Sequence, residues 1–514
     1  MDGSIALNGS NIETPRILIV GSGFAGLGMA IKLKAAGIND FVLLEKDSGV
    51  GGTWRVNNYP GCACDVQSHL YSFSFAPNPH WSRMFSPQPE IRGYLEACAE
   101  RFGITPHIRF NTAMARGEWL EARKLWRVST SDGRIFEAPI FIPAIGGLST
   151  PALPEIAGLA SFKGEVFHSQ QWRHDYDLKG KRVAVIGTGA SAIQFVPQIQ
   201  EQVAQLDLYQ RTPPWIIGKP DRAILAAERS RFARIPALQK AWRAGLYGMM
   251  EARALAFTVN PKLMKIFQKL AVAFIHKQVK DPALRAKLTP DYTIGCKRVL
   301  ISNDYYPALG KPNVEVITQG VQAVRAHSVI DAEGVERKVD AIILGTGFAA
   351  TNPVPENLLI GRDGADLGKL WQAGPEAYKG SCINGFPNLF MIVGPNTGLG
   401  HNSMVYMIES QIAYVMDALK VMAESKLATV EVKSLDQNRY NAGLQARHKN
   451  TIWSTGGCKS WYVHPKSGKN TSLWPGFTFA FRAITRSFDL GAYNFTAQLQ
   501  SHQPAHSASE EVIA

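Results

Sequence analysis

The stretch that decides the fold is RILIVGSGFAG, residues 16–26, in which an apolar run leads directly into a glycine-rich turn. A helix-compatible run, residues 27–36, follows it, and a second apolar run, residues 41–44, comes after that. Strand, glycine turn, helix and strand in this order form the unit that holds the pyrophosphate of a dinucleotide at a helix N-terminus. We therefore predict a Rossmann-like unit at the start of the chain.

The individual residues of this unit indicate which nucleotide it binds. Gly21, Gly23 and Gly26 allow the tight turn and the close approach of a pyrophosphate to backbone N–H groups. Glu45 ends the second strand, about 20 residues after the last glycine, where a carboxylate accepts hydrogen bonds from a ribose 2′-hydroxyl. This site is expected to take a nucleotide with a free 2′-hydroxyl.

The pattern recurs in KRVAVIGTGASA, residues 181–192, followed by a helical run and a strand, residues 206–210. Arg211 follows that strand, and Arg211 and Glu45 each lie 24 residues after the first glycine of their own loop. A carboxylate at this place repels a 2′-phosphate, whereas a guanidinium binds it bidentately. The second site is therefore predicted to prefer NADP over NAD. The residues expected to contact it are Gly187, Thr188, Gly189, Ala190, Arg211 and Thr212.

Two dinucleotide sites in one chain indicate electron transfer between two cofactors, for which FAD and NADPH are the natural pair. Two further apolar runs, residues 341–344 and 389–393, each end in glycine and are expected to return to the first domain. The predicted fold class is α/β, with the NADP-binding domain inserted in the FAD-binding domain. The expected boundaries are 1–147 for the first part of the FAD-binding domain, 148–338 for the NADP-binding domain with a basic helical insertion at 218–296, and 339–514 for the second part of the FAD-binding domain and a C-terminal lid.

Composition excludes several classes of protein. A length of 514 residues corresponds to about three structural units. The 46% hydrophobic content supports a large core. The sequence contains no run of about 18 apolar residues, so a membrane-spanning helix is not expected. The start has no pattern of a signal peptide, and the six cysteines show no repeating spacing of a disulfide framework. We expect a cytoplasmic protein, and no spacing of side chains indicates a metal site.

The net charge of +13 is concentrated in one segment. Residues 221–298 contain sixteen Lys and Arg and five Asp and Glu, so they carry +11 of the total. Within it Leu263, Ile266, Phe267 and Leu270 recur at helical spacing, with lysines on the remaining face. A solvated basic helix face is one interpretation; electrostatic attraction of a phosphorylated cofactor and weak contact with an anionic membrane are the others. No nucleic-acid-binding pattern accompanies the charge.

The stretch between the two glycine loops resembles a known family. Residues 162–172, FKGEVFHSQQW, fit the pattern F-x-G-x-x-x-H-x-x-x-W of the Baeyer–Villiger monooxygenases, which belong to the class B flavin-dependent monooxygenases. Trp172 stands where hydroxylating relatives usually have Phe or Tyr, and Arg173 follows where the family usually has Pro or Asp. The resemblance extends from about Arg16 to Phe488, and its motifs occur in the family's order.

This resemblance implies roles for further residues. Thr53, Trp54 and Tyr71 are similar to flavin contacts of the family, and Trp461 is similar to part of a mobile segment that closes over the nicotinamide. Lys297 and Arg298 lie in a loop similar to the one that carries the family's active-site arginine. The resemblance assigns catalysis to Arg298 and the orientation of its guanidinium, together with cofactor contacts, to Asp65. His168 is expected to be structural.

The reaction implied by the resemblance inserts one oxygen atom from O₂ beside the carbonyl of a small-molecule ketone, giving an ester or lactone. NADPH reduces FAD, and reduced FAD adds O₂ to form a C4a-peroxide whose negative charge a fixed cation stabilises. One alternative is a hydroxylating flavin monooxygenase that oxidises amines or sulfides. Others are an NADPH-dependent flavin or disulfide reductase and a basic scaffold without activity.

Overall fold

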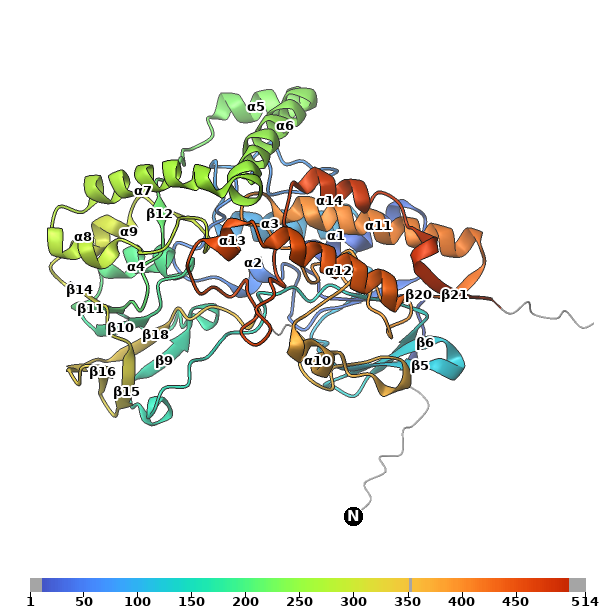
Figure 1. The fold of residues 1–514 in the computed structure, drawn as a ribbon, viewed down its shortest axis with the longest axis horizontal. Coiled ribbons are helices and arrows are strands. Elements are labelled where there is room, and N and C mark those ends of the chain that lie inside the picture. The colour runs from blue at the N-terminus through green and yellow to red at the C-terminus, as the bar shows by residue number, and fades with distance from the viewer. Residues whose placement is uncertain (1–11, 351–353, 499–514) are drawn as a thin grey trace, which may run out of the picture.

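The first nucleotide-binding unit is built on a parallel sheet with strand order β4-β3-β2-β8. The computed structural model describes residues 12–350 and 354–498 (Figure 1). Every residue of the three longer strands is buried, as in sheets that helices cover on both faces. The bounds of these elements are β2 Ile17–Val20, β3 Phe41–Leu44, β4 Ile108–Arg109, β8 Ile140–Pro143 and the helix α1 Phe24–Ala35, which follows the glycine turn.

The chain returns to this sheet near its C-terminal third. Leu389 bridges Phe141 of β8, and Phe390 N donates to Phe141 O over 2.9 Å. The long helix α11 (Met404–Glu424) then packs against α1. The prediction that residues 389–393 return to the first domain is confirmed.

The second nucleotide-binding unit is a parallel sheet with strand order β14-β11-β10-β18-β9. Its elements are β9 Glu165–His168, β10 Arg182–Ile186, α4 Ala192–Gln200, β11 Gln205–Tyr209, β14 Val314–Ile317 and β18 Ala341–Leu344. Here the sequence-based prediction for residues 341–344 is wrong, because β18 lies between β10 and β9 and not in the first sheet. A short apolar strand that ends in glycine fits either parallel sheet, so only the partner strands distinguish them.

Smaller sheets flank the two units. One has strand order β1-β7-β6-β5-β19, one β15-β16-β17, and two pairs are β12-β13 and β20-β21. The bounds are β1 Ile12–Glu13, β5 Met114–Leu120, β6 Leu125–Thr130, β7 Ile135–Ala138, β12 Ile216–Ile217, β13 Leu300–Ile301, β15 Val321–Arg325, β16 Ser328–Asp331, β17 Glu336–Lys338, β19 Leu359–Ile360, β20 Leu427–Val432 and β21 Tyr493–Ala497.

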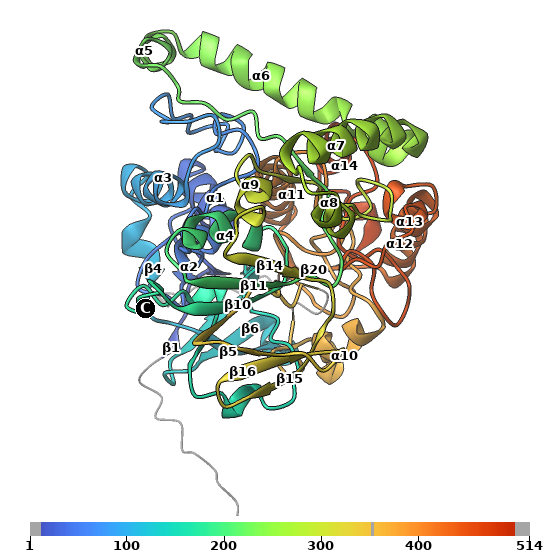
Figure 2. The ribbon, with the colours of Figure 1, turned by 90° about the vertical axis from the view of Figure 1, so that its left-hand side faces the viewer.

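The basic segment is helical, as the sequence predicts. It comprises α5 Ala226–Arg234, α6 Pro236–Ala252, α7 Met264–Gln278 and α8 Pro282–Leu288. Figures 1 and 2 both show α5, α6 and α7 along one edge of the molecule, opposite β15 and β16. The apolar face of α7 that the sequence suggests is not the buried face: the helix buries Met264, Ala271 and Ile275 instead.

The remaining helices lie beside the nucleotide-binding units. They are α2 Thr53–Val56, α3 Gln88–Arg101, α9 Tyr305–Leu309, α10 Leu367–Leu370, α12 Ser434–His448, α13 Ile452–Thr455 and α14 Thr478–Ile484. Across residues 12–350 and 354–498 we find no helix with the length and apolarity needed to cross a membrane.

Candidate active site

The first glycine loop is held in a tight turn by its own backbone. Gly21 has φ +102°, and its N–H donates to Leu44 O over 2.8 Å. A Cβ on Gly26 would lie 1.8 Å from Gly21 O, so only glycine fits where α1 leaves the turn. Gly23 faces Gly52, and its Cβ would be 3.6 Å from the Gly52 Cα, an ordinary contact. Gly26 is therefore required for the turn. Gly23 is not required for it, but its lack of a side chain leaves the backbone N–H groups open to a pyrophosphate.

Glu45 lies at the end of β3 and is 95% buried, since only 5% of the residue is exposed. Its carboxylate accepts hydrogen bonds from Ser22 N over 2.9 Å, from Ser22 Oγ over 2.5 Å and from Asp47 N over 2.9 Å. Glu45 and Thr53 line one cavity, whose other lining residues are Lys46, Asp47, Gly52, Arg55, Val56, Ile145 and Ser149. A carboxylate, bare glycine backbone and an adjoining cavity at the strand ends fit the ribose and pyrophosphate of FAD.

Trp54, which follows the cavity residue Thr53 in the chain, contacts Tyr71. Trp54 Nε1 donates to Tyr71 Oη over 3.1 Å, and their ring centroids are 5.6 Å apart, edge to face. Phe24, the first residue of α1, packs against Tyr71 with centroids 5.2 Å apart. The aromatic cluster therefore connects the first glycine loop to the segment that carries Asp65.

The second glycine loop has the same geometry and more open space. Gly187 has φ +109°, and its N–H donates to Tyr209 O over 3.2 Å. A Cβ on Gly189 would have no neighbour within 4 Å, and Ala190 is exposed beside it. Thr188 Oγ1 donates to Thr212 O over 3.4 Å, which joins the loop to the segment after β11. The loop is thus shaped like the first one and open to a ligand.

Two cations meet next to this loop. Arg211 is exposed, and it lies close enough to Lys297 to lower the pKa of that ammonium, which burial lowers further. Burial is the largest cause of the lower Lys297 pKa, and the charge of Asp291 opposes it in part. In the part of the chain that the structure describes, neither cation forms an ion pair. Two cations held near each other beside an open glycine loop fit an anionic group such as a 2′-phosphate.

Arg298 and Asp65 form an ion pair although 233 positions separate them in the chain. Arg298 Nε donates to Asp65 Oδ2 over 2.8 Å, and Nη2 lies 2.6 Å from the same oxygen. The Asp65 charge raises the pKa of Arg298, against the opposing effect of burial. The Arg298 side chain keeps 37% of its surface accessible, so a reacting group can reach it. This contact is the one that the sequence predicts.

The C-terminal segment contacts the same place. Tyr462 is 2% exposed, and its hydroxyl has no hydrogen-bond partner among the described residues. It lies near Arg298, whose charge counteracts part of the rise in the Tyr462 pKa that burial causes. Trp461, the predicted lid residue, is 49% exposed, with its ring centroid 4.6 Å from that of Tyr462. Arg298 Nη1 also donates to Leu399 O over 3.5 Å.

A disulfide between Cys296 and Cys458 joins the arginine loop to the C-terminal segment. It corrects the expectation that the six cysteines form no structural crosslink, because two partners 162 residues apart have no spacing signature. The other four cysteines are free and buried. Burial raises the pKa of Cys62 to about 12 and raises that of Cys64 as well, so both stay protonated near neutral pH.

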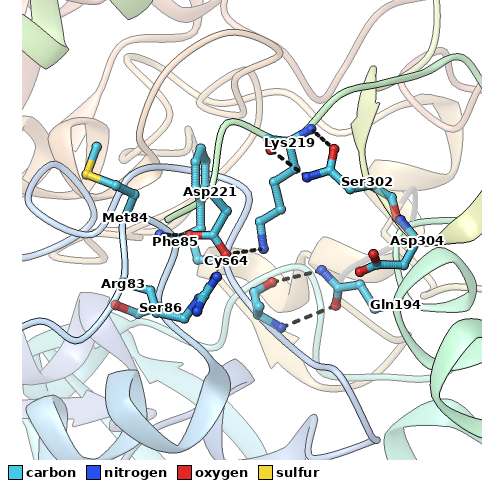
Figure 3. A network of polar contacts seen from close by, with 12 residues as sticks. Cys64, Arg83, Met84, Phe85, Ser86, Gln194, Lys219, Asp221, Ser302 and Asp304 are labelled. Atoms are coloured by element: carbon cyan, nitrogen blue, oxygen red, sulfur yellow. Dashed lines mark hydrogen bonds and ion pairs between the residues drawn. The ribbon is translucent and has the colours of Figure 1, made fainter. Parts of the chain in front are cut away.

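Polar contacts fix residues 59–71, which carry Asp65 and which we call the flavin-side loop, and the segment after them to the second unit (Figure 3). Gln194, on α4, donates from Nε2 to Ala63 O over 2.9 Å and accepts from Ala63 N over 3.3 Å. Arg83 Nε lies 3.0 Å from Asp221 Oδ2, and Phe85 N donates to Asp221 Oδ1 over 3.3 Å. The helix that follows the second glycine loop therefore sets the position of the segment next to Asp65.

His168, for which the sequence predicts a structural role, is buried. It ends β9, is 1% exposed, and accepts a hydrogen bond at Nδ1 from Gln170 N over 3.1 Å. Burial lowers its pKa, so the ring is neutral at neutral pH. The sequence alone assigned no individual role to Gln194, Tyr462 or the disulfide. For Gln194 a usable signal was its place three residues into the helix after the second glycine loop, and for Tyr462 it was its place beside Trp461 in the segment that resembles the family's mobile one. For the disulfide the chain carries no such signal.

Known proteins resemble this chain along most of its length. A family model for pyridine nucleotide-disulphide oxidoreductases matches residues 18–241. A Baeyer–Villiger monooxygenase of Pseudomonas aeruginosa is 61% identical over 481 residues, covering 94% of this chain and 91% of that protein. One of Streptomyces coelicolor is 49% identical over 483 residues, covering 94% and 92%. A solved steroid monooxygenase bound to NADP superimposes with a TM-score of 0.83 at 28% identity, covering 94% of this chain and 100% of that one.

Proposed function

Because this chain belongs to the Baeyer–Villiger monooxygenases, we propose that it uses NADPH, FAD and O₂ to insert one oxygen atom beside the carbonyl of a small ketone, giving an ester or lactone. The observation that carries the proposal is the Arg298–Asp65 pair, an accessible guanidinium held by a carboxylate from the flavin-side loop. A fixed cation of this kind stabilises negative charge that develops on oxygen during the reaction.

Arg298 supplies a charge that does not depend on pH near neutrality. Asp65 raises the pKa of Arg298, so the guanidinium stays protonated throughout the working range. Asp65 also fixes its direction, since both Nε and Nη2 contact one carboxylate oxygen. Nη1 donates only a long hydrogen bond, 3.5 Å, to Leu399 O, so it is available to donate to a substrate oxygen instead. Bound FAD, once NADPH has reduced it, supplies the activated oxygen; the chain supplies charge, position and exclusion of water.

NADPH is held by the second unit, whose residues run from 148 to the end of β18 at Leu344. Gly187, Gly189, Ala190 and Thr188 bind the pyrophosphate, because the loop is open above Gly189 and lies at the start of α4. The 2′-phosphate is bound by Arg211 and Thr212, with Lys297 as the second cation. Two cations beside one phosphate give the preference for NADPH over NADH.

FAD is held by the first unit. Gly21, Gly23 and Gly26 present the pyrophosphate site, and Glu45 accepts from the ribose. Thr53 lines the adjoining cavity, while Trp54 beside it contacts Tyr71. Trp461 covers the nicotinamide side as part of the C-terminal segment, which the disulfide joins to the arginine loop.

Disulfide reduction is not supported, although the family model that matches residues 18–241 includes such enzymes in its description. That chemistry needs a thiolate beside the flavin. Cys62 and Cys64 lie in the flavin-side loop, but burial raises the pKa of both, and that of Cys62 reaches about 12. Neither is a nucleophile at neutral pH.

The test is product analysis with isotopic oxygen. Purified enzyme containing FAD is incubated with NADPH, a simple cyclic ketone and ¹⁸O₂, and a lactone with one ¹⁸O atom is expected. Consumption of NADPH with release of hydrogen peroxide alone would contradict the proposal, and a labelled sulfoxide from a sulfide without lactone would indicate a hydroxylating enzyme.

Two variants then distinguish a role of Arg298 in oxygen insertion from a contribution to folding and FAD binding. For Arg298→Ala we expect normal anaerobic reduction of FAD by NADPH and loss of lactone formation. For Arg298→Lys, which keeps the charge but not the two-point contact with Asp65, partial activity is expected. Full lactone formation by Arg298→Ala would show that another group stabilises the developing charge.

A further inference from the structure

Large apolar side chains are exposed in one part of the molecule far more than elsewhere. Of the 21 large hydrophobic residues that are exposed within the described chain, 11 lie between Leu225 and Leu270. Eight of them belong to α6, α7 and the residues directly before these helices. We call these eight the insertion surface: Ile235, Leu238, Trp242, Met249, Leu263, Ile266, Phe267 and Leu270. Apolar clusters of this size on a protein surface mark a site of interaction.

The opposite face of α6 is already fixed to the protein. Arg243 Nη1 donates to His69 O over 2.6 Å and to Leu70 O over 3.1 Å. Gln239 Nε2 donates to Asn78 O over 2.7 Å, and the buried Glu251 accepts from Asn402 Nδ2 over 2.6 Å. These contacts attach α6 firmly to the protein by one face. Trp242 and its apolar neighbours are therefore exposed on a fixed helix, and their exposure does not come from loose attachment of the helix.

The charges around the insertion surface have one sign. Residues 226–278 contain ten Lys and Arg but only two acids. Glu228 pairs with Arg222 at 2.7 Å, and Glu251 is buried. Exposed cations that form no ion pair within the described residues lie beside the apolar side chains: Arg231, Arg234, Lys240, Lys262, Lys265 and Lys269. The surface is therefore apolar and cationic, with no acid to neutralise it.

We propose that the insertion surface docks on an anionic lipid bilayer. Exposed aromatic and aliphatic side chains flanked by lysines along helices are the arrangement that lies in the interface of a membrane. A second copy of the chain is the poorer occupant, because a two-fold contact would place this cationic face against itself. Figures 1 and 2 show α5, α6 and α7 along one edge of the molecule.

The buried side of α7 and the turn Leu255–Val259 before it lie close to the arginine loop. A Cβ on Gly295 would lie 2.6 Å from Met264 Cε and 3.3 Å from Phe257 Cε1, so these two side chains pack on the loop three residues before Arg298. The helix α7 thus carries part of the docking surface on its exposed side and contacts the arginine loop through Met264. Docking therefore brings this loop, and with it the candidate active site, close to the lipid surface.

Vesicle co-sedimentation of the FAD-containing enzyme tests the proposal. We expect binding to vesicles of phosphatidylcholine with 30% phosphatidylserine at 50 mM NaCl, weaker binding at 500 mM, and little binding to phosphatidylcholine alone. The variant K262Q/K265Q/K269Q should bind roughly 100-fold more weakly, about fivefold per lysine. The variant W242S/F267S should lose at least about tenfold, since both side chains would no longer enter the lipid.

Matched controls carry the same changes elsewhere. K163Q/K179Q/K338Q removes three exposed lysines from the second unit, shortly before β9, shortly before β10 and at the end of β17, and V335S/L435S removes two exposed apolar side chains. Both should bind like the unaltered enzyme. All variants should keep their bound FAD, their melting temperature and their NADPH oxidation, since the altered residues are exposed and outside the active site.

Absence of binding to phosphatidylserine vesicles at 50 mM NaCl would overturn the proposal, as would equal losses in the control variants. A stable dimer in light scattering that W242S/F267S converts to a monomer would assign the surface to a second copy instead. Retention on an acidic protein column without binding to vesicles would assign it to an acidic protein.

Discussion

The disulfide between Cys296 and Cys458 can be removed without touching a group that binds a cofactor. The change is Cys458→Ser. In the chain-entropy account, a crosslink that closes a loop of 162 residues stabilises the folded state by up to about 5 kcal/mol. Spread over the unfolding entropy of a chain of 514 residues, that corresponds to a fall in melting temperature of about 5 °C. Release of Cys458 also frees the segment that positions Tyr462 beside Arg298.

The assay combines thiol counting with thermal unfolding. Denatured but unreduced enzyme should expose four thiols, and reduced enzyme six. Melting followed by flavin fluorescence should show the lower temperature for Cys458→Ser and for the unaltered enzyme treated with reductant. The double variant Cys296→Ser/Cys458→Ser should match the single one, because the bond is lost once. Six thiols in the unreduced enzyme, or additive effects of the two substitutions, would refute the reasoning.

The other predictions concern the two cofactors. Arg211→Ala should raise the Michaelis constant for NADPH about 10- to 150-fold, the equivalent of one lost hydrogen bond to a charged group, and leave that for NADH unchanged; an equal rise in both would contradict the assignment. Gly26→Ala should prevent stable folding with FAD, because the new Cβ would overlap Gly21 O. Gly189→Ala should fold with FAD and weaken only NADPH binding. Circular dichroism and flavin absorbance measure folding and FAD content and so distinguish the two variants. Gln194→Leu should slow FAD reduction in stopped-flow measurements without lowering FAD content, since it releases the flavin-side loop from α4; an unchanged rate would mean that other contacts suffice.

Much of the fold could be predicted because it depends on short-range geometry. The turn at Gly21–Gly26 excludes any side chain at its last position, and that restriction is visible as a glycine in the sequence. The two strand-end residues, Glu45 and Arg211, follow from equal spacing after each glycine loop. The strand at residues 341–344 could also be recognised as a strand, but its sheet could not, because nothing in AIIL distinguishes β10 from β8 as a neighbour.

The candidate site was less accessible to prediction. The Arg298–Asp65 pair followed from the family resemblance, and the structure bears out the contact. The disulfide had no comparable signal, since a pair 162 residues apart looks like two unrelated cysteines. Gln194 could not be singled out from the sequence, because a glutamine on a helix is usually a solvated side chain.

The sequence by itself therefore determines local features. These are two phosphate-binding turns, the residues Glu45 and Arg211 that follow them, and a helical segment with most of the positive charge. Folding in three dimensions adds the partners, because contacts across hundreds of residues depend on which surfaces meet and not on spacing. The clearest case is α7, where helical periodicity suggests that Leu263, Ile266, Phe267 and Leu270 pack inward. In the folded protein Met264, Ala271 and Ile275 occupy the interior, and the four apolar side chains with their lysines face outward. Periodicity defines a face of a helix, but only the neighbours of the helix decide whether that face is buried.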